Sequence, residues 1–314
     1  NTVAERYRND SRATADHLEV KLRAIGCSRV ARPMLETFEP DEIHKLARME
    51  KNRHRADRYI KGWRPGPRRN NLAKIDNSAF DDDLSFDFKS VGQIPEVLST
   101  HLDEGIARNT LIGVTGHRLD KLDLSTPHFK VACVATLREI ERLHPNSRFW
   151  VVSALAEGAD RYVAELAMDV LGAALIAPLP LPYDLYKRDF DGTSGSAEQF
   201  ERLVARAKYY FEMPLIEDYV DLEADVEGPN PKRARQYALA GAYIVQRCHE
   251  MIAVWDGQAA AGGGGTGDVV AWRQRGVPAD LKYPCCFFPP VEQTAPFVVP
   301  PDPPRSFVPA RLEV

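Results

Sequence analysis

Residues 252–270 read IAVWDGQAAAGGGGTGDVV, an apolar run that passes through four consecutive glycines into a helix-like segment. The apolar run predicts a buried strand, and Thr266 followed by Asp268 is typical of the first turn of a helix. Consecutive glycines raise the entropic cost of folding, so the run at 262–265 requires a physical reason. Either these glycines form a disordered surface loop, or they let the backbone approach a bound phosphate or ribose at the start of a helix.

The same order of strand, loop and helix recurs through the middle of the chain. Apolar runs predict strands at 110–115, 148–153, 173–177 and 251–255, with a further short strand near 282–287. Helical patterns lie between them, at about 127–143, 158–171, 195–210, 231–249 and 267–275. Buried strands separated by helices indicate a parallel sheet that is covered on both faces. We therefore predict an α/β fold with a Rossmann-like doubly wound parallel sheet, in which ligands bind at the carboxyl ends of the strands.

Three regions of the chain differ in composition. Residues 1–108 have helical patterning and are predicted to form a small, mainly helical domain, and residues 109–288 carry the predicted sheet. Residues 289–314 form a proline-rich tail, which we expect to be extended and either loose or packed over a neighbour. The run of basic residues at 51–74, in which Asp57 is the single acid, is either a solvated surface or an anion-binding patch.

Composition and charge argue against several classes of function. The 314 residues include 45 Asp and Glu and 41 Lys and Arg, and the net charge of −4 argues against a general nucleic-acid-binding protein. No apolar run reaches the roughly 18 residues that are needed to span a bilayer. The five cysteines lack metal-ligand spacing, so we predict no metal, no cofactor and a reduced, cytoplasmic protein. Because the sequence begins with Asn rather than Met, it is consistent with a fragment or a processed chain.

The loop after the first predicted strand, GVTGHR at 113–118, combines small residues with a hydroxyl, an imidazole and a guanidinium. Arg118 can bind a phosphate in a bidentate manner, although a plain tight turn with exposed polar residues is an equal alternative. The candidate ligand-binding residues in this loop are Gly113, Thr115, Gly116, His117 and Arg118.

The second loop, in SALAEGADRYVAELA at 153–167, also leads from a strand into a helix. Ser153 ends the strand and Gly158 opens the helix, where backbone N–H groups can face an anion. The neighbouring carboxylates of Glu157 and Asp160 could bind ribose hydroxyls or act as acid or base, or they could simply cap the helix.

Two further loops complete the predicted site. The loop PLPLPYDLYKRDF at 178–190 could form the wall of a pocket with Tyr183, Tyr186, Lys187, Arg188, Asp189 and Phe190. An aromatic residue there, with Tyr183 as the candidate, could stack on a base, although tyrosines beside prolines commonly just pack a loop. After the fourth strand, the candidates are Asp256, Gly263, Gly264, Gly265 and Thr266. Because three glycine-containing loops converge on one edge of one sheet, we predict a nucleotide-sized site.

Taken in order, GVTGHR, SALAEGADRYVAELA, LPLPYDLYKRDF and the segment from MIAVWDG to GGGGTGDVVAWRQRGVP resemble the SLOG superfamily over about residues 109–288. This superfamily includes DNA-processing proteins, LOG-type cytokinin-activating phosphoribohydrolases and nucleotide-sensing domains of bacterial conflict systems. The resemblance implies a Rossmann-like fold that binds a nucleotide or nucleotide-derived small molecule, often in a homo-oligomer.

The resemblance departs from the LOG-type enzymes at one position. Their signature GGxGTxxE ends in a glutamate that takes part in N-glycosidic bond hydrolysis, and the corresponding residue here is Val269. This difference favours a ligand sensor in bacterial, antiviral signalling. If Glu157 or Asp268 supplies a catalytic carboxylate instead, the alternative is a nucleosidase or phosphoribohydrolase that cleaves the N-glycosidic bond of a nucleotide. The acidic net charge disfavours DNA processing.

The first domain resembles the RyR domain, a small helical module repeated in ryanodine receptors, over about residues 42–106. The resemblance depends on Gly62-Trp63, Gly66, Lys74, Leu84, Lys89, Ile94-Pro95 and Leu98, while Asp76-Asn77 replaces the usual His-Pro. It implies a binding module. Trp63, Arg64 and Lys74 could contact a phosphorylated or nucleotide ligand by stacking and charge, or Trp63 could belong to the core.

Overall fold

The computed structural model describes residues 15–31, 35–102, 104–216, 222, 230–260, 263–282 and 293–312. The chain folds as two compact units, with the first extending to Asn109 and the second beginning at Thr110. We call them unit 1 and unit 2. Within the described ranges, no helix is both long and apolar enough to cross a membrane.

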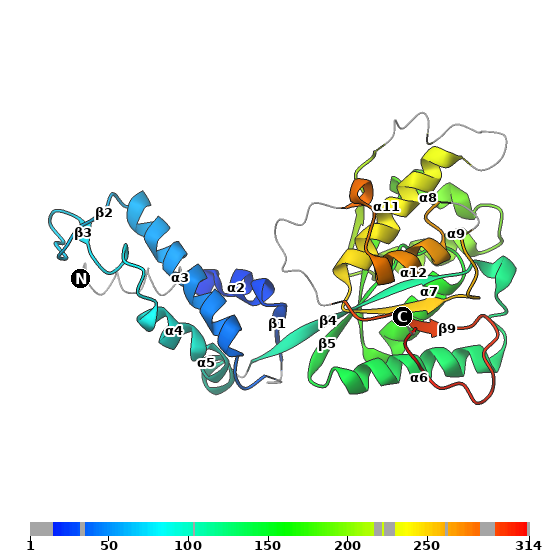
Figure 1. Ribbon diagram of the computed structural model, residues 1–314, viewed down its shortest axis with the longest axis horizontal. Coiled ribbons are helices and arrows are strands. Elements are labelled where there is room, and N and C mark those ends of the chain that lie inside the picture. Colours follow the sequence, from blue (N-terminus) through cyan, green and yellow to red (C-terminus); the bar gives the residue numbers. More distant parts are fainter. Residues whose placement is uncertain are drawn as a thin grey trace. The chain divides into compact units, whose positions relative to one another are not determined.

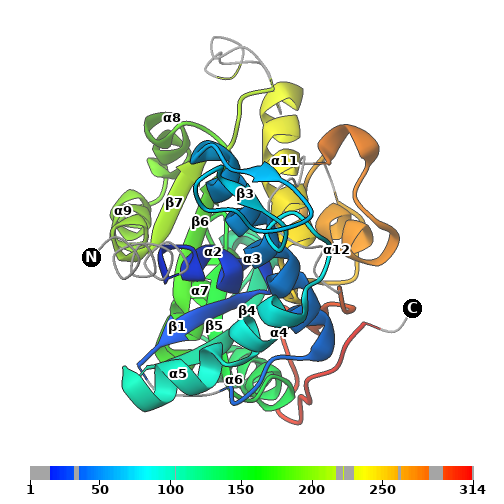
Figure 2. The ribbon, with the colours of Figure 1, turned by 90° about the vertical axis from the view of Figure 1, so that its left-hand side faces the viewer.

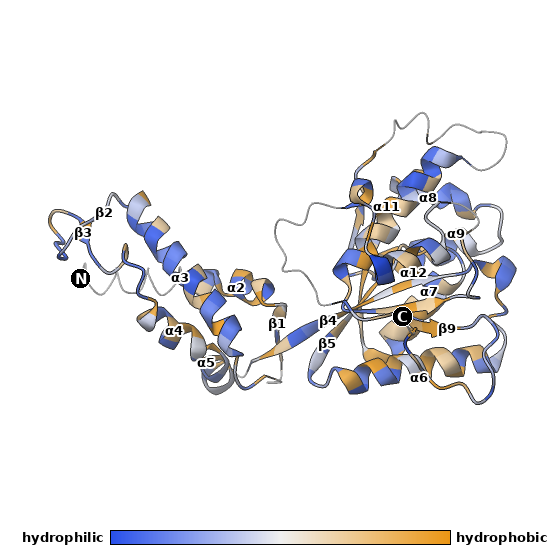
Figure 3. Cartoon of the chain, viewed as in Figure 1, coloured by the Kyte–Doolittle hydropathy of each residue, from blue (hydrophilic) through white to orange (hydrophobic). Residues whose placement is uncertain are grey.

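Unit 1 is mainly helical and is organised around one long helix (Figure 1). Its elements are α2 (Leu18–Ala24), β1 (Cys27–Val30), α3 (Pro40–Ile60), β2 (Arg64–Pro65), β3 (Ile75–Asp76), α4 (Ser85–Gly92), α5 (Ile94–His101) and the first residues of β4 (Gly105–Gly116). Pro40 starts α3, and the side chains of Glu39 and Glu42 form a capping box there. Figure 3 shows α3 as largely hydrophilic, because only a narrow stripe that includes Leu46 and Ala47 faces the core.

Unit 2 is an α/β domain in which strands and helices alternate. It contains the rest of β4, then α6 (Pro127–Leu143), β5 (Ser147–Val152), α7 (Ala159–Leu171), β6 (Ala174–Leu179), α8 (Tyr183–Lys187), α9 (Ser196–Arg206), β7 (Tyr209–Glu212), α11 (Pro231–Arg247), β8 (Glu250–Val254), α12 (Thr266–Arg275) and β9 (Phe297–Val299). Short 3₁₀ turns lie at Leu119–Lys121, Arg188–Phe190 and Ala279–Leu281.

The strands of unit 2 form a sheet in the order β7-β6-β5-β4-β8-β9 (Figures 1 and 2). The pairs β5–β6, β6–β7, β4–β8 and β8–β9 are parallel, and β1 pairs antiparallel with β4. The chain therefore moves outward in one direction from β4 to β7 and then returns to the other side of β4 with β8. In such sheets, the crevice outside the carboxyl ends of the strands at this reversal is the usual place for a ligand.

Side chains alternate between two cores along each strand, which confirms the predicted doubly wound arrangement. In β4, Ile112 and Val114 pack with α6, α7 and α9, whereas Leu111 packs on the other side with α11 and α12. Figure 1 shows α6 on one side of the sheet and α11 and α12 on the other. This two-sided burial explains why the strands read as apolar runs without polar alternation.

Four of the predicted strands are present as β4, β5, β6 and β8, but other strand predictions need correction. The helix expected to reach residue 210 ends at Arg206, and β7 follows it. The strand predicted near 282–287 falls, apart from Lys282, outside the described residues. The described part of the proline-rich tail is not loose, because Phe297–Val299 forms β9 in register with β8.

Candidate functional site

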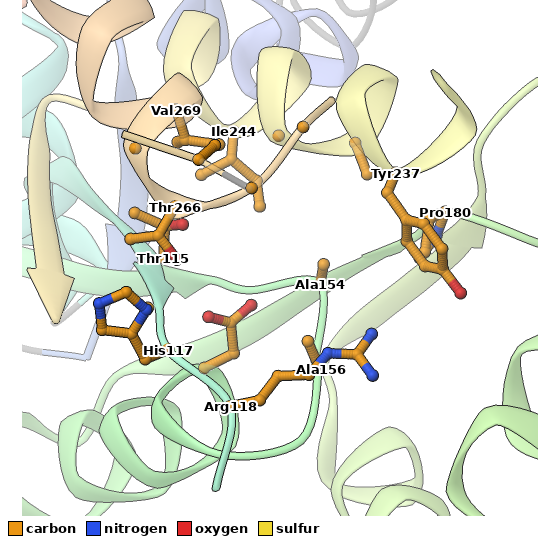
Figure 4. Close-up of a pocket in the computed structure, with 18 of the residues that line it drawn as sticks. Thr115, His117, Arg118, Ala154, Ala156, Pro180, Tyr237, Ile244, Thr266 and Val269 are labelled. Atoms are coloured by element: carbon orange, nitrogen blue, oxygen red, sulfur yellow. The ribbon is translucent and has the colours of Figure 1, made fainter. Parts of the chain in front are cut away.

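A cavity of about 400 Å³ opens at the carboxyl edge of the unit 2 sheet (Figure 4). The loop after β4 contributes residues 115–118, and the loops after β5 and β6 contribute Ala154, Ala156 and Pro180. Helix α11 and the glycine loop before α12 close the other side. The cavity lies at the reversal of strand order, and its volume is within the range of roughly 300–1,000 Å³ that is usual for small-molecule sites.

The glycine loop brings unsatisfied backbone donors to this cavity. The N–H groups of Gly265, Thr266 and Gly267 have no hydrogen-bond partner among the described residues, and all three residues line the cavity. The N–H of Gly264 donates to Asp268 Oδ2 at 2.9 Å, which fixes the loop at the start of α12. Free N–H groups at a helix start, with the positive end of the helix dipole, favour a bound anion.

Gly264 shows why this loop needs glycine. Its φ is +83°, and a Cβ there would lie 2.7 Å from the backbone of Ala238 on α11. Any other residue would be strained and would push the loop away from the helix. Gly262 lies outside the described residues. The structure thus gives Gly264 a packing requirement at the point where residues 265–267 line the cavity.

The loop after β4 places four polar residues on the opposite side, and these are His117, Arg118, Asp120 and Lys121. His117 Nε2 lies 3.0 Å from Asp256 Oδ1 and 3.1 Å from the Asp256 backbone N, so its role as donor or acceptor follows its protonation. Lys121 Nζ lies 3.3 Å from Asp256 Oδ2. A hydrogen bond from the Gln258 N–H, followed by Lys121 and His117, lowers the pKa of Asp256 to about 2. Asp256 is therefore an anion that positions two cavity-lining side chains.

Arg118 is an exposed side chain beside the cavity. Its guanidinium makes no hydrogen bond or ion pair with any described residue. Figure 4 shows Arg118 and His117 on one side of the cavity and Ile244 and Val269 on the other. Because no described residue accepts a hydrogen bond from this guanidinium, its donors are available to an anionic group of a ligand.

Asp160 is the buried carboxyl group of the site. It lies in the first turn of α7, lines the cavity and is only 7% exposed. Burial raises the pKa of this carboxyl to about 7, against the opposing effects of Arg118 and of hydrogen bonds from the backbone at Gly116 and Ala156. Near neutral pH it is therefore present in both protonation states, as a general acid or base requires.

The far end of the cavity is mainly apolar and aromatic. Pro180, Tyr186 and Tyr237 line it together with alanines of α11. The Tyr237 hydroxyl donates to Asp189, which also accepts from Arg233, and burial raises the pKa of Tyr237. The ring of Tyr237 is therefore held in place, and it offers an aromatic surface of the kind on which a planar base can stack.

Nine of the site residues predicted in unit 2 line this cavity, and seven do not. The nine are Thr115, Gly116, His117, Arg118, Asp160, Gly263, Gly264, Gly265 and Thr266. The seven are Gly113, Ser153, Glu157, Gly158, Tyr183, Asp256 and Asp268.

Several of these seven have packing or positioning roles. A Cβ on Gly113 would lie 2.8 Å from Ile244, so this glycine lets α11 approach β4. Gly158 has φ +103°, and a Cβ there would lie 2.6 Å from the carbonyl oxygen of His117. Ser153 Oγ donates to the Asp160 carbonyl at 3.1 Å, and Tyr183 packs on aromatic neighbours.

The two residues predicted as catalytic carboxylates lie outside the cavity lining. Asp268 accepts the hydrogen bond from Gly264 N–H and so holds the glycine loop. Glu157 has one carboxylate oxygen, Oε1, that is buried and has no hydrogen-bond partner in the described part of the chain. Asp160 is thus the carboxyl group that this geometry places against a ligand.

Sequence reasoning missed the contributions of Lys121, Tyr237, Ile244 and Val269, whereas Tyr186 lines the cavity as the third loop motif had suggested. Lys121 follows Arg118 by three residues, and its place in the same cation-rich loop was an available signal. Tyr237 and Ile244 belong to a helix that borders the cavity along its side. No local motif marks such residues, because their position depends on how α11 packs over the sheet.

In unit 1, Trp63 is only 7% exposed, and the guanidinium groups of Arg58 and Arg69 lie 4.8 and 5.9 Å from its ring centroid. This burial agrees with the alternative that Trp63 belongs to the core of the small domain. Arg64 is exposed, and Lys74 Nζ donates to the Lys61 carbonyl at 2.8 Å.

Among the residues that the structure describes, no group of three or more His, Cys, Asp or Glu side chains is placed to hold a metal ion. No protein-family model matches the chain, and no curated protein matches it.

Proposed function

We propose that unit 2 binds a nucleotide or nucleotide-derived small molecule, and that the chain acts as a sensor of this ligand. The observation that carries the proposal is the mixed lining of the cavity. The start of α12, where the N–H groups at 265–267 have no partner among the described residues, and Arg118 from the loop after β4 line opposite sides, and Tyr186, Tyr237 and Pro180 add an aromatic and apolar wall. A ligand that carries both an anionic group and a planar ring matches this lining.

The resemblance of the four loop motifs to the SLOG superfamily supports the same ligand class. It also motivates two finer parts of the proposal, that the protein works as a homo-oligomer and that it takes part in bacterial antiviral signalling. In this proposal, ligand binding in unit 2 is coupled to the RyR-like module in unit 1.

The test is a thermal-shift screen of nucleoside monophosphates, NAD, ADP-ribose and cyclic nucleotides, followed by calorimetric titration of each hit. A ligand at 100 times its dissociation constant stabilises the folded state by about 2.7 kcal/mol. Arg118→Ala is expected to weaken binding about 10- to 100-fold, because charge-assisted hydrogen bonds contribute about 1.5–3 kcal/mol each. Arg275→Ala is the matched control, since Arg275 is exposed in the last turn of α12 and does not line the cavity. Absence of any shift across the panel would overturn the proposal.

A second candidate function is hydrolysis of an N-glycosidic bond, and the specific observation that favours it is Asp160. A buried carboxyl with a pKa raised to about 7 by desolvation can donate a proton to a leaving base or, when ionised, stabilise an oxocarbenium-like transition state. Chromatography of each hit after incubation separates the two functions. Turnover that is lost in Asp160→Asn, while ligand binding is retained, supports the hydrolase; binding without turnover supports the sensor.

A further inference from the structure

We infer that the tip of unit 1, residues 59–74, binds the surface of an anionic lipid bilayer. The tip consists of the end of α3, the turn at Trp63, strand β2 and the segment that leads to β3. Figure 1 shows the end of α3 and both short strands together at one end of unit 1. The hydrogen bond from Lys74 Nζ to the Lys61 carbonyl ties the two ends of the segment together. Residues 59–74 therefore form one continuous surface.

Positive charge is concentrated on this tip. Its five cations are all exposed, and no Asp or Glu lies within 59–74; the cations are Lys61, Arg64, Arg68, Arg69 and Lys74. Asp57, one turn earlier on α3, pairs with Lys61 at 2.8 Å. The side chains of Arg64 and Arg68 make no hydrogen bond or ion pair with a described residue. In a chain of net charge −4, such a local excess of cations is complementary to an anionic bilayer.

Apolar side chains project from the same surface. Leu72 is fully exposed, at 101%, and Ile60 is 86% exposed. A single exposed apolar residue is ordinary on a protein surface, but here two large aliphatic side chains lie among five cations. Proteins that lie on membranes combine basic groups, which contact lipid headgroups, with apolar groups that insert at the boundary of the acyl chains. The tip offers both kinds of group.

A nucleic acid is the other polyanion that the cations could contact, and the aromatic residues argue against it. Single strands bind largely through aromatic rings on which bases stack. Trp63 is nearly buried beneath Arg58 and Arg69, and the Tyr59 ring packs on Phe80 at a centroid distance of 4.7 Å. The most exposed apolar groups are instead aliphatic, and these favour insertion into lipid.

The experiment is co-sedimentation of the full chain with vesicles of phosphatidylcholine alone and of phosphatidylcholine mixed with phosphatidylserine. Binding is expected only to the mixed vesicles. Arg64→Gln with Arg68→Gln should lower the partition coefficient about 25-fold, at about fivefold for each basic residue removed. The matched control is Lys130→Gln with Arg275→Gln, two exposed cations of unit 2, which makes the same change in net charge and should have no effect.

The apolar residues have their own pair of variants. Ile60→Ser with Leu72→Ser should lower vesicle binding by about tenfold or more, because each side chain loses the burial that lipid provides. Val131→Ser with Val308→Ser, which changes two exposed residues of unit 2, is the control and should leave binding intact. Equal binding to both vesicle types, or equal losses in test and control variants, would overturn the inference. Binding to a single-stranded oligonucleotide in place of vesicles would overturn it as well.

Discussion

Replacing Asp160 with asparagine should change how the stability of the protein depends on pH. The carboxyl group has an ordinary pKa of 3.8, and burial in the cavity wall raises its pKa to about 7 in the folded protein. Between these two values the folded state holds a proton that the unfolded state has released. The unmodified protein therefore loses stability as the pH rises through this window, whereas the asparagine variant lacks this loss.

The size of the effect follows from the gap between the two pKa values. About three pKa units correspond to about 4 kcal/mol, and roughly 2–3 kcal/mol of this falls between pH 5 and pH 8. The free energy of unfolding of Asp160→Asn, minus that of the unmodified protein, should increase by this amount over that range. Exchange of a carboxyl for an amide also perturbs the hydrogen bonds from Gly116 and Ala156, but that contribution is nearly independent of pH.

Urea denaturation followed by circular dichroism at pH 5, 6, 7 and 8 measures this difference. Other titrating groups, such as His249, whose pKa burial lowers to about 4, are present in both proteins and cancel in the subtraction. A difference that stays constant from pH 5 to pH 8 would refute the reasoning. It would mean that the Asp160 carboxyl ionises in the folded protein as easily as in water.

Two further predictions concern packing and buried charge. Gly158→Ala should destabilise the protein by about 2–6 kcal/mol, because the backbone at this position is strained for alanine and the new Cβ would lie too close to His117. At Gly172 the φ angle is also positive, but no atom lies within 4 Å of the new Cβ, so Gly172→Ala should cost only about 1–2 kcal/mol. Urea denaturation of both variants measures this difference. Arg311→Met should cost about 3 kcal/mol at pH 7, because it leaves Glu250, 1% exposed, without its main partner. Partners of Glu250 lower its pKa to about 2, so this cost should shrink progressively as the pH falls from the unfolded value of 4.5 through about 2. Thermal melts should therefore show a smaller difference between the variant and the unmodified protein at pH 3 than at pH 7.

The strands that sequence reasoning found are those buried on both faces. Each reads as an apolar run, and the helices between them follow from their patterns. Sequence reasoning missed β7, which has the sequence Tyr-Tyr-Phe-Glu. This strand is largely exposed at the edge of the sheet, so no apolar run marks it. Sequence reasoning also missed β9, because Pro296 and Pro300 flank only three residues, and prolines are a sign against a central strand but not against an edge strand.

The residues of the candidate site also fall into those that the sequence predicts and those that it does not. Residues at the end of a strand or at the start of the helix that follows, such as Thr115 and Asp160, could be predicted because parallel strands all end at the same edge. Residues such as Tyr237 could not, because a helix that borders a cavity is recognised only once its packing is known. The sequence also could not show which of Asp160 and Glu157 faces the cavity. The two carboxylates are three residues apart, and their burial, which is known only from the structure, distinguishes them.

The position of β9 has a consequence for how the protein is made. A ribosome that has synthesised the chain only as far as α12 has released a sheet whose β8 edge still lacks its neighbour. At that stage Glu250 also lacks Arg311, because both β9 and Arg311 come later in the chain. Open strand edges and unpaired buried charges are the features of nascent chains that aggregate. In the order of synthesis, β8 therefore gains its neighbour, and Glu250 its Arg311 partner, only after α12 has been made.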